Sequence, residues 1–175
     1  MSVHVTFSIL VGILMLQGCG AWQSVSDASS NAYHAVFFKK IKVLKVDLSA
    51  REALNLDEAG HATSVAVRVY QLKNRKMFDA VSYNDLLKDD RTILSEDLQA
   101  SAAAVVSPGA SVSLSQPMQA DTKFVAIVAF YRAPGSGERW KYIIDKERLD
   151  VQKPLKLELV DQLLLVDDVT AVSPR

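Results

Sequence analysis

The sequence predicts an all-β domain with a minor helical insert, folded as a two-sheet antiparallel β-sandwich. Three observations lead to this prediction. Apolar and polar residues alternate along several short segments, turn-forming glycines fall between those segments, and one stretch has the pattern of a helix instead. A chain of 175 residues, of which 49% are hydrophobic, is long enough to bury the core of one such domain.

The first strand candidates lie between residues 37 and 72. Phe37–Leu48 is strand-like, but its alternation breaks near Val43–Leu44, which predicts a β-bulge at that point. Ser64–Leu72 alternates without a break and places Val65, Val67 and Val69 on one face.

A helical insert is predicted at about residues 75–102. Ser82, with Asp85 three residues later, has the form of a capping box in front of two leucines. Met77, Phe78 and Val81 would form the apolar side of a preceding helical turn. The insert would pack this side on a sheet.

The remaining strand candidates follow the insert. Phe124–Tyr131 is apolar on both faces and is therefore predicted to be a central, fully covered strand. The other segments alternate, and they are "ASVSLS" at 110–115, "WKYIID" at 140–145 and "PLKLELV" at 154–160. Pro108-Gly109 and Pro134-Gly135 are turn pairs between them.

The first residues read as a secretion signal and a tether. Val5–Leu16 is apolar and uncharged, but it is shorter than the roughly 20 residues that a membrane-spanning helix needs. We therefore assign residues 1–18 to a signal peptide, 19–33 to a flexible tether rich in small polar residues, and 34–175 to the β-sandwich domain with its insert.

The chain has one cysteine, Cys19, so it has no internal disulfide and no multi-cysteine zinc site. A buried residue, a nucleophile, a metal ligand and an attachment point are the alternatives for it. "LQGC" at residues 16–19 resembles the lipobox of bacterial lipoproteins, which implies cleavage before Cys19 and a covalent lipid on it. Gly20, in place of an aspartate that would resemble an inner-membrane retention signal, favours the outer membrane.

No pattern in the sequence indicates catalysis, a metal or a further cofactor. Basic and acidic residues balance at 20 each, which argues against nucleic-acid binding. There is no zinc-protease histidine pair and no nucleophile elbow. The acidic pairs Asp89-Asp90, Glu96-Asp97 and Asp167-Asp168 are predicted to be solvated surface. An envelope hydrolase remains an alternative if the fold gathers titratable groups around His61 or one of these pairs.

The segment Ser49–Thr63 is longer than a hairpin connection needs, and long loops on rigid scaffolds often carry function. It mixes charged and apolar residues. The candidate contact residues are Arg51, Glu52, Leu54, Leu56, Asp57 and Glu58.

The segments "VRVYQLK…F" at Val67–Phe78 and "VAIVAFYR…W" at Val125–Trp140 resemble the outer-membrane lipoproteins of the type VI secretion system, the VasD/Lip family. The resemblance implies a transthyretin-like β-sandwich on the periplasmic face of the outer membrane, present in several copies. It also implies a structural adapter, not an enzyme, that binds the periplasmic C-terminal region of the IcmF-like inner-membrane component. In the family the loop between the first two strands makes much of that contact, and Ser49–Thr63 occupies its position. The alternative is a periplasmic lipoprotein that binds a small ligand, because transthyretin-like sandwiches can hold small molecules.

Overall fold

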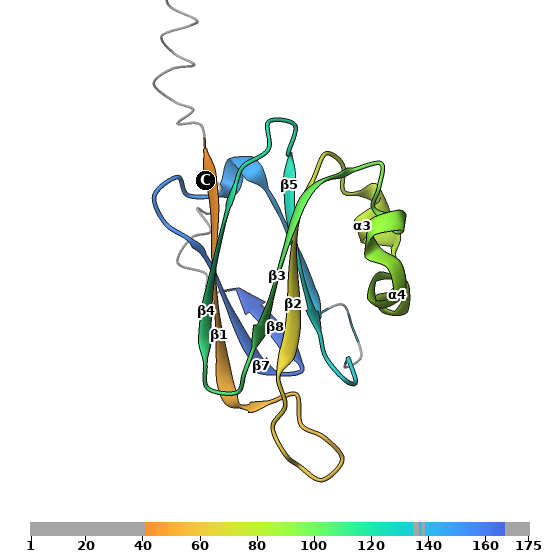
Figure 1. Cartoon of the computed structure of the whole chain (residues 1–175), viewed down its shortest axis with the longest axis vertical. Coiled ribbons are helices and arrows are strands. Elements are labelled where there is room, and N and C mark those ends of the chain that lie inside the picture. Colours follow the sequence, from red (N-terminus) through yellow and green to blue (C-terminus); the bar gives the residue numbers. More distant parts are fainter. Residues whose placement is uncertain (1–40, 135–136, 138, 167–175) are drawn as a thin grey trace, which may run out of the picture. The chain divides into compact units, whose positions relative to one another are not determined.

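The computed structural model describes residues 41–134, 137 and 139–166, and these form two four-stranded sheets that face each other (Figure 1). The strands are β1 (Val43–Leu54), β2 (Val65–Leu72), β3 (Leu98–Val106), β4 (Ser111–Pro117), β5 (Phe124–Phe130), β6 (Lys141–Asp145), β7 (Leu155–Asp161) and β8 (Leu163–Val166). One sheet has the order β4-β1-β7-β8 and the other the order β3-β2-β5-β6. The predicted sandwich is confirmed. The predicted signal peptide, the predicted tether and Cys19 lie outside the described residues.

Strand pairing within the sheets is antiparallel with one exception. β1 pairs in antiparallel fashion with β4 on one side and in parallel with β7 on the other. Parallel neighbours cannot be joined by a hairpin, and β1 and β7 are accordingly connected through all the intervening strands. The prediction of an antiparallel sandwich therefore holds except at the centre of one sheet.

The core lies between the sheets and follows the alternation of the sequence. Leu44, Val46 and Leu48 of β1 are buried, as are the three leucines that alternate along β7. All residues of β5 from Val125 to Ala129 are buried, because the helices cover the outer face of its sheet. The predicted central strand is confirmed. Each large apolar side chain removed from water here contributes on the order of 2 kcal/mol.

The β-bulge predicted at Val43–Leu44 is wrong. From Val43 to Leu48 the strand alternates regularly between outward and inward side chains. Ile41 and Lys42, just before β1, are not in a strand, so the alternation begins at Val43. Phe37–Lys40, the start of the predicted segment, lie outside the described residues. The irregularity of β1 is at its other end, where its register with β7 shifts between Ala50 and Leu54.

The helical insert is shorter than predicted. It consists of α3 (Lys76–Ala80) and α4 (Tyr83–Ile93), and the residues after Leu98 form strand β3 instead of continuing the helix to about 102. The alanines of "ASAAA" favour a helix by local propensity. Pairing of β3 with the whole length of β2, from Leu72 opposite Leu98 to Val65 opposite Val106, overrides that preference.

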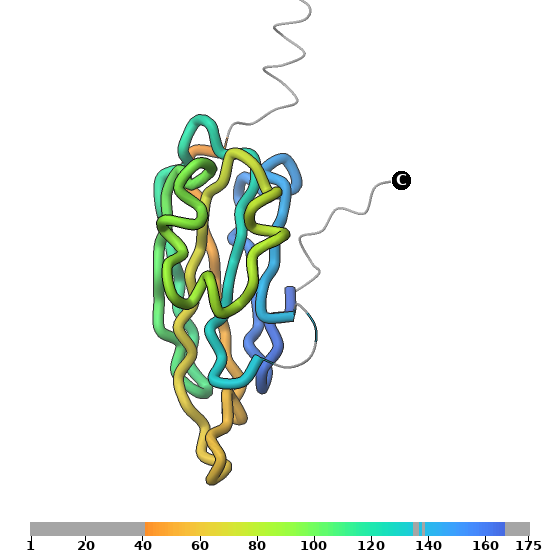
Figure 2. Tube along the Cα trace, turned by 90° about the vertical axis from the view of Figure 1, so that its right-hand side faces the viewer, coloured from red at the N-terminus to blue at the C-terminus, as the bar shows by residue number. Residues whose placement is uncertain are grey.

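The helices lie on the outer face of the β3-β2-β5-β6 sheet (Figure 2). The predicted capping box begins α4: the Ser82 hydroxyl accepts from the Asp85 N–H at 3.2 Å and donates to its carboxylate at 2.6 Å. Phe78 and Leu86 are buried against the sheet, and Phe78 packs against Tyr70. Met77, which we expected to share the buried side, is 46% exposed.

Candidate functional site

The predicted contact loop is partly strand. β1 continues to Leu54, so that Arg51 and Glu52 lie in the sheet and the loop proper spans residues 55–64. Arg51 Nε donates to Glu158 of β7 at 2.8 Å, and this hydrogen bond is the main reason why the pKa of Glu158 lies below its usual value. Leu54 is fully buried. Leu54 therefore belongs to the core, and its prediction as a contact residue is wrong.

Asn55 braces the start of the loop. It has a positive φ of 48°, a conformation that asparagine tolerates better than most residues, and only 2% of it is exposed. Its Nδ2 donates to Thr63 Oγ1 at 2.8 Å and to the Ser64 carbonyl at 3.2 Å, which closes the loop on itself. Its Oδ1 accepts from the Arg132 N–H at 2.8 Å. One side chain thus joins both ends of the loop to the segment after β5.

Asp57 shapes the tip of the same loop. Its carboxylate accepts from the N–H groups of Ala59 at 2.9 Å and His61 at 2.8 Å, and the His61 ring lies 3.3 Å from its second oxygen. The His61 N–H is the main cause that holds the pKa of Asp57 below its usual value. Gly60, with φ +80°, completes the turn between them. The main role of the Asp57 side chain is therefore to stabilise the conformation of the loop.

Most of the loop is exposed, since only Asn55, Asp57 and Thr63 of its ten residues are not. Leu56 is 40% exposed, and Glu58 and His61 point to solvent. Glu52, on the last part of β1, is exposed beside them and lies 3.5 Å from where a Cβ on Gly109 would be. Leu56, Glu58 and Glu52 of the predicted set are available to a partner.

Neighbouring segments at this end are joined to the loop. The Gly109 N–H donates to the Arg51 carbonyl at 3.2 Å, and the hydroxyls of Ser64 and Ser107 lie 3.2 Å apart. The Asn55 N–H donates to the Asp161 carbonyl at 2.9 Å. The connection from β1 to β2 thus sits on three other connections at the lower end of Figure 1.

A hollow of about 520 Å³ lies beside the base of the loop and is open to solvent. Thr63 and Ser64 line it on the loop side, and Leu87 of α4 and Phe130 line it on the other. Leu87 is 52% exposed. Tyr83, also in its wall, donates to the Tyr131 carbonyl and stacks edge-on against Trp140. This apolar hollow was not predicted, because its walls come from segments far apart in the sequence.

Asp90 is not the solvated residue that the acidic pair Asp89-Asp90 suggested. It is 9% exposed, and its carboxylate accepts from the Tyr70 hydroxyl at 2.7 Å and pairs with Arg68 at 2.8 Å. Burial, followed by the bond to Asp90, raises the pKa of Tyr70. Tyr70 is fully buried, so no substrate reaches it. Through these two contacts, Asp90 attaches helix α4 to strand β2.

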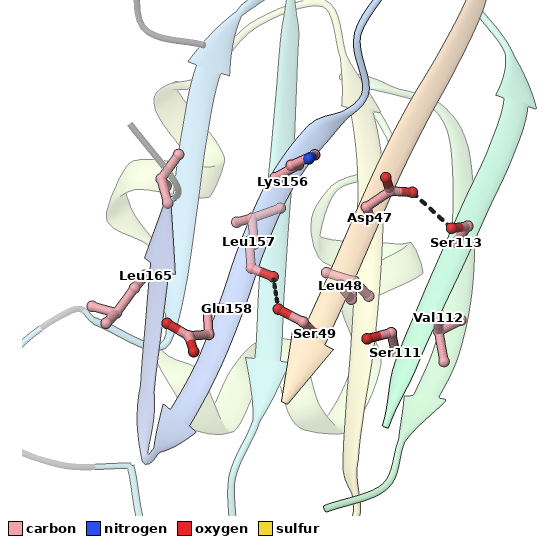
Figure 3. Close-up of a pocket in the computed structure, with 11 residues that line it drawn as sticks. Asp47, Leu48, Ser49, Ser111, Val112, Ser113, Lys156, Leu157, Glu158 and Leu165 are labelled. Carbon is pink, nitrogen blue, oxygen red and sulfur yellow. Dashed lines mark hydrogen bonds between the residues drawn. The ribbon is translucent and has the colours of Figure 1, made fainter. Parts of the chain in front are cut away.

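A second hollow, of about 630 Å³, lies on the outer face of the β4-β1-β7-β8 sheet (Figure 3). Its polar groups bond within the sheet: Ser113 donates to Asp47 at 2.7 Å, and Ser49 to the Leu157 carbonyl at 3.5 Å. Charged Lys156 and Glu158 stand on the same open surface. It lacks the enclosed apolar walls that a small-ligand site usually has.

Within residues 41–134, 137 and 139–166, no three histidine, cysteine or carboxylate side chains are grouped so as to hold a metal. His61 is close only to Asp57 among the described acidic groups with which it could pair. Among the helices that the structure describes, none is long and apolar enough to cross a bilayer.

Comparisons with known proteins agree on one family. Residues 42–162 match the model of the family described as "Type VI secretion lipoprotein, VasD, EvfM, TssJ, VC_A0113". No curated protein sequence matches the chain. A chain of the solved "Type VI membrane complex" is 33% identical with a TM-score of 0.69, and the match covers 73% of this chain and 98% of that one.

Two further structures are similar. A chain in "T6SS protein TssM C-terminal domain (869-1107) from EAEC" is 30% identical with a TM-score of 0.64, and the match covers 72% of this chain and 98% of that one. Lip of Serratia marcescens, described as a membrane-bound component of the type VI secretion system, shares the fold at 14% identity. Its TM-score is 0.64, and the match covers 71% of this chain and 96% of that one. The family match over most of the chain shows that the protein belongs to the type VI secretion lipoproteins.

Proposed function

We propose that this protein is a structural adapter of the type VI secretion membrane complex, without a catalytic role. Lipid on Cys19 would hold it at the periplasmic face of the outer membrane. The loop at residues 55–64 would bind the periplasmic C-terminal region of the IcmF-like inner-membrane component. The proposed binding of the partner rests on the construction of this loop. Asn55 and Asp57 hold the loop in one conformation, while Leu56 and Glu58 face solvent.

Pre-organisation supports a binding role for the loop. A loop that is already ordered loses less conformational entropy on binding than a flexible loop does. The buried hydrogen bonds of Asn55 and the carboxylate of Asp57 order ten residues that pack little apolar surface of their own. An exposed leucine beside an exposed glutamate gives a partner one apolar and one ionic contact.

The similar chain in the TssM structure also supports this partner. That chain is matched over 98% of its length by 72% of our 175 residues, about 126, whereas the named TssM domain, residues 869 to 1107, spans 239. The similar chain is thus about half as long as the named domain. We infer that the similar chain is not the TssM domain itself. Its length fits a lipoprotein of the present family that accompanies TssM in that structure.

Lipid anchoring is supported by the resemblance of residues 16–19 to a lipobox and by the membership in a lipoprotein family. A single acyl chain binds membranes only marginally, whereas a diacylglyceryl group on the thiol of Cys19, with a further acyl chain on its amine, would anchor the protein stably. The chain enters the described domain at residue 41, and β1 then runs from there to the loop. Anchor and contact loop are therefore attached to opposite ends of one strand.

The proposal is tested by changing the exposed residues of the loop and leaving its braces intact. We expect Leu56→Ser with Glu58→Lys to weaken binding of the full-length, detergent-solubilised lipoprotein to the partner's periplasmic region by about tenfold or more. Biolayer interferometry measures the dissociation constant. Deletion of the longer segment Ser49–Thr63 is less informative, because it would also remove Leu54 from the core.

The matched control is Leu87→Ser with Lys88→Glu, which changes an exposed leucine and an exposed charge on α4 instead. Both double variants should retain the wild-type thermal midpoint, since all four side chains are exposed. Equal dissociation constants for the loop variant and the wild type would refute the loop as the contact.

A further inference from the structure

An uncharged stretch of 23 residues, from Leu98 to Ala120, stands out in this chain. It lies between Asp97 and Asp121 and contains no lysine, arginine, aspartate or glutamate, although 40 of the 175 residues are charged. In the structure it forms β3, the turn to β4 and β4 itself. The absence of charge thus coincides with two complete strands.

Both strands are edge strands, and both edges lie on the same side of the sandwich. β3 is the outermost strand of its sheet and β4 the outermost strand of the other, and the two contact each other through their shared turn (Figures 1 and 2). On the opposite side, β8 and the segment before β6 meet through the Leu164 N–H, which donates to the Arg139 carbonyl at 2.8 Å. We call the side formed by Leu98–Val106 and Ser111–Pro117 the uncharged edge.

Most of β3 lacks the usual protection of an edge strand. Its one irregularity of register with β2 lies at its start, opposite Gln71 and Leu72, and the proline of the uncharged edge, Pro117, ends β4. Soluble proteins cover such strands or place lysine, proline or a bulge on them, because unpaired N–H and C=O groups accept a further strand. β3 has nine residues without lysine or proline. Its outward side chains are Ser101, Ala103 and Val105, and Val105 is 65% exposed, more than any other large hydrophobic residue described. By contrast, β6 carries Lys141 and Asp145, and β8 has only four residues.

We propose that the uncharged edge is the contact between two copies of this protein, in which the two β3 strands pair in antiparallel fashion across a two-fold axis. Such pairing would join the two β3-β2-β5-β6 sheets into one continuous sheet. The small side chains of Ser101 and Ala103 let the two backbones approach to the spacing of a β-ladder.

The lack of charge favours a second copy over another protein as the occupant. A two-fold axis brings identical patches together, so a charged side chain near the axis would face its own like charge. This edge avoids that repulsion along both strands. A strand from a different protein would impose no such condition, since opposite charges on the two strands would then strengthen the pairing.

The contact is expected to be weak in dilute solution and effective on a membrane. Pairing of two nine-residue strands buries less area than a stable interface needs. Tethering both copies to one surface raises their effective concentration and makes such a contact productive. In this one respect the inference rests on the anchoring proposed above.

Single cysteines provide the test, because Cys19 is the only cysteine of the chain. Ser101→Cys and Ala103→Cys each place one thiol on the uncharged edge of the full chain in isolated membranes. After mild oxidation, at least one of them should give about tenfold more disulfide-linked dimer than Leu87→Cys, a comparably exposed position on α4. The wild type reports the background from Cys19.

A charge on the edge should abolish the cross-link. Val105→Lys, added to the better cysteine variant, would bring two ammonium groups together and remove the dimer, whereas Leu87→Lys added to the same variant would leave it. Cross-linking at both residues 101 and 103 that is no greater than at residue 87, or a cross-link that Val105→Lys does not reduce, would overturn the inference. A disulfide-linked adduct with another protein in place of the dimer would also overturn it.

A measurement of partner binding distinguishes this inference from the proposed function. Val105→Lys should bind the partner's periplasmic region with the wild-type dissociation constant, because Val105 is not part of the loop at residues 55–64. The same cross-linking with detergent-solubilised protein at high concentration shows pairing without the membrane. Failure of anchoring would remove the dimer from membranes only, and failure of the edge contact would remove it from both.

Discussion

Asn55 is the residue on which the geometry of the candidate site depends most. Its side chain satisfies groups from Thr63, Ser64 and Arg132, and its backbone adopts a conformation that is costly for most residues. The sequence marks it only weakly, as one asparagine in a long polar segment. Its partners lie up to 77 residues away, and no local pattern reveals them.

Replacement of this asparagine tests its role. We expect Asn55→Ala to lower the free energy of unfolding by about 2 to 3 kcal/mol, because it loses the hydrogen bonds and because alanine tolerates a positive φ less well than asparagine does. Asn55→Gly should cost about 1 kcal/mol less, since glycine accepts the backbone conformation but still lacks the side chain. Urea unfolding measures both. A loss for the alanine variant within about 0.5 kcal/mol of zero would contradict the role.

At the scale of elements, the helical insert contains both a confirmed and a wrong prediction. Its start was predicted correctly, and its end was not. The capping box at Ser82 is local, so its signal lies within four residues and the structure confirms it. The end of the insert is not local, because pairing with β2 converts the alanine-rich segment into β3. The burial of Asp90 is equally non-local, since Arg68 and Tyr70 on β2 create it.

The attachment of α4 to β2 through Asp90 is testable by removing its carboxylate. We expect Asp90→Ala to lower the free energy of unfolding by about 2 to 3 kcal/mol, because the buried Tyr70 hydroxyl and the half-buried Arg68 lose their partner. Lys88→Ala, on the exposed face of the same helix, should change it by less than about 0.5 kcal/mol. Chemical denaturation measures both variants.

A double variant distinguishes the hydrogen bond from general effects on the helix. Tyr70→Phe combined with Asp90→Ala should be less destabilised than the sum of the two single variants, since each removes the same contact. Additive losses would show that Asp90 supports the helix in some other way.

At the scale of the whole molecule, alternation and turn residues predict a sandwich but not its strand order. The parallel pairing of β1 with β7 joins segments about 110 residues apart, and neither segment differs in pattern from an antiparallel strand. The position of the loop at residues 55–64, at one end of the domain, was predictable from the order of strands. The three connections beneath it, and the hollow beside it, were not.

Membrane attachment is a property of the whole chain and has its own test. We expect Cys19→Ser to remove the protein from the outer-membrane fraction and to abolish labelling with radioactive palmitate, because the thiol is the proposed attachment point of the diacylglyceryl group. The far-ultraviolet circular dichroism of the variant should match the wild type. Sedimentation of Cys19→Ser with the outer membrane would refute anchoring through this residue.

The direction of β1 has a consequence for force. This strand begins just after residue 41, where the chain enters the domain, and it ends at the loop that begins with Asn55, so its twelve residues reach about 40 Å. Tension between the two membranes would pull along this strand. It would load the hydrogen bonds to β4 and β7 together, in shear, instead of opening them one after another. With Cys19 and the loop as the two attachment points proposed above, β1 would resist stretching of the cell envelope, and the rest of the sandwich would hold it in position.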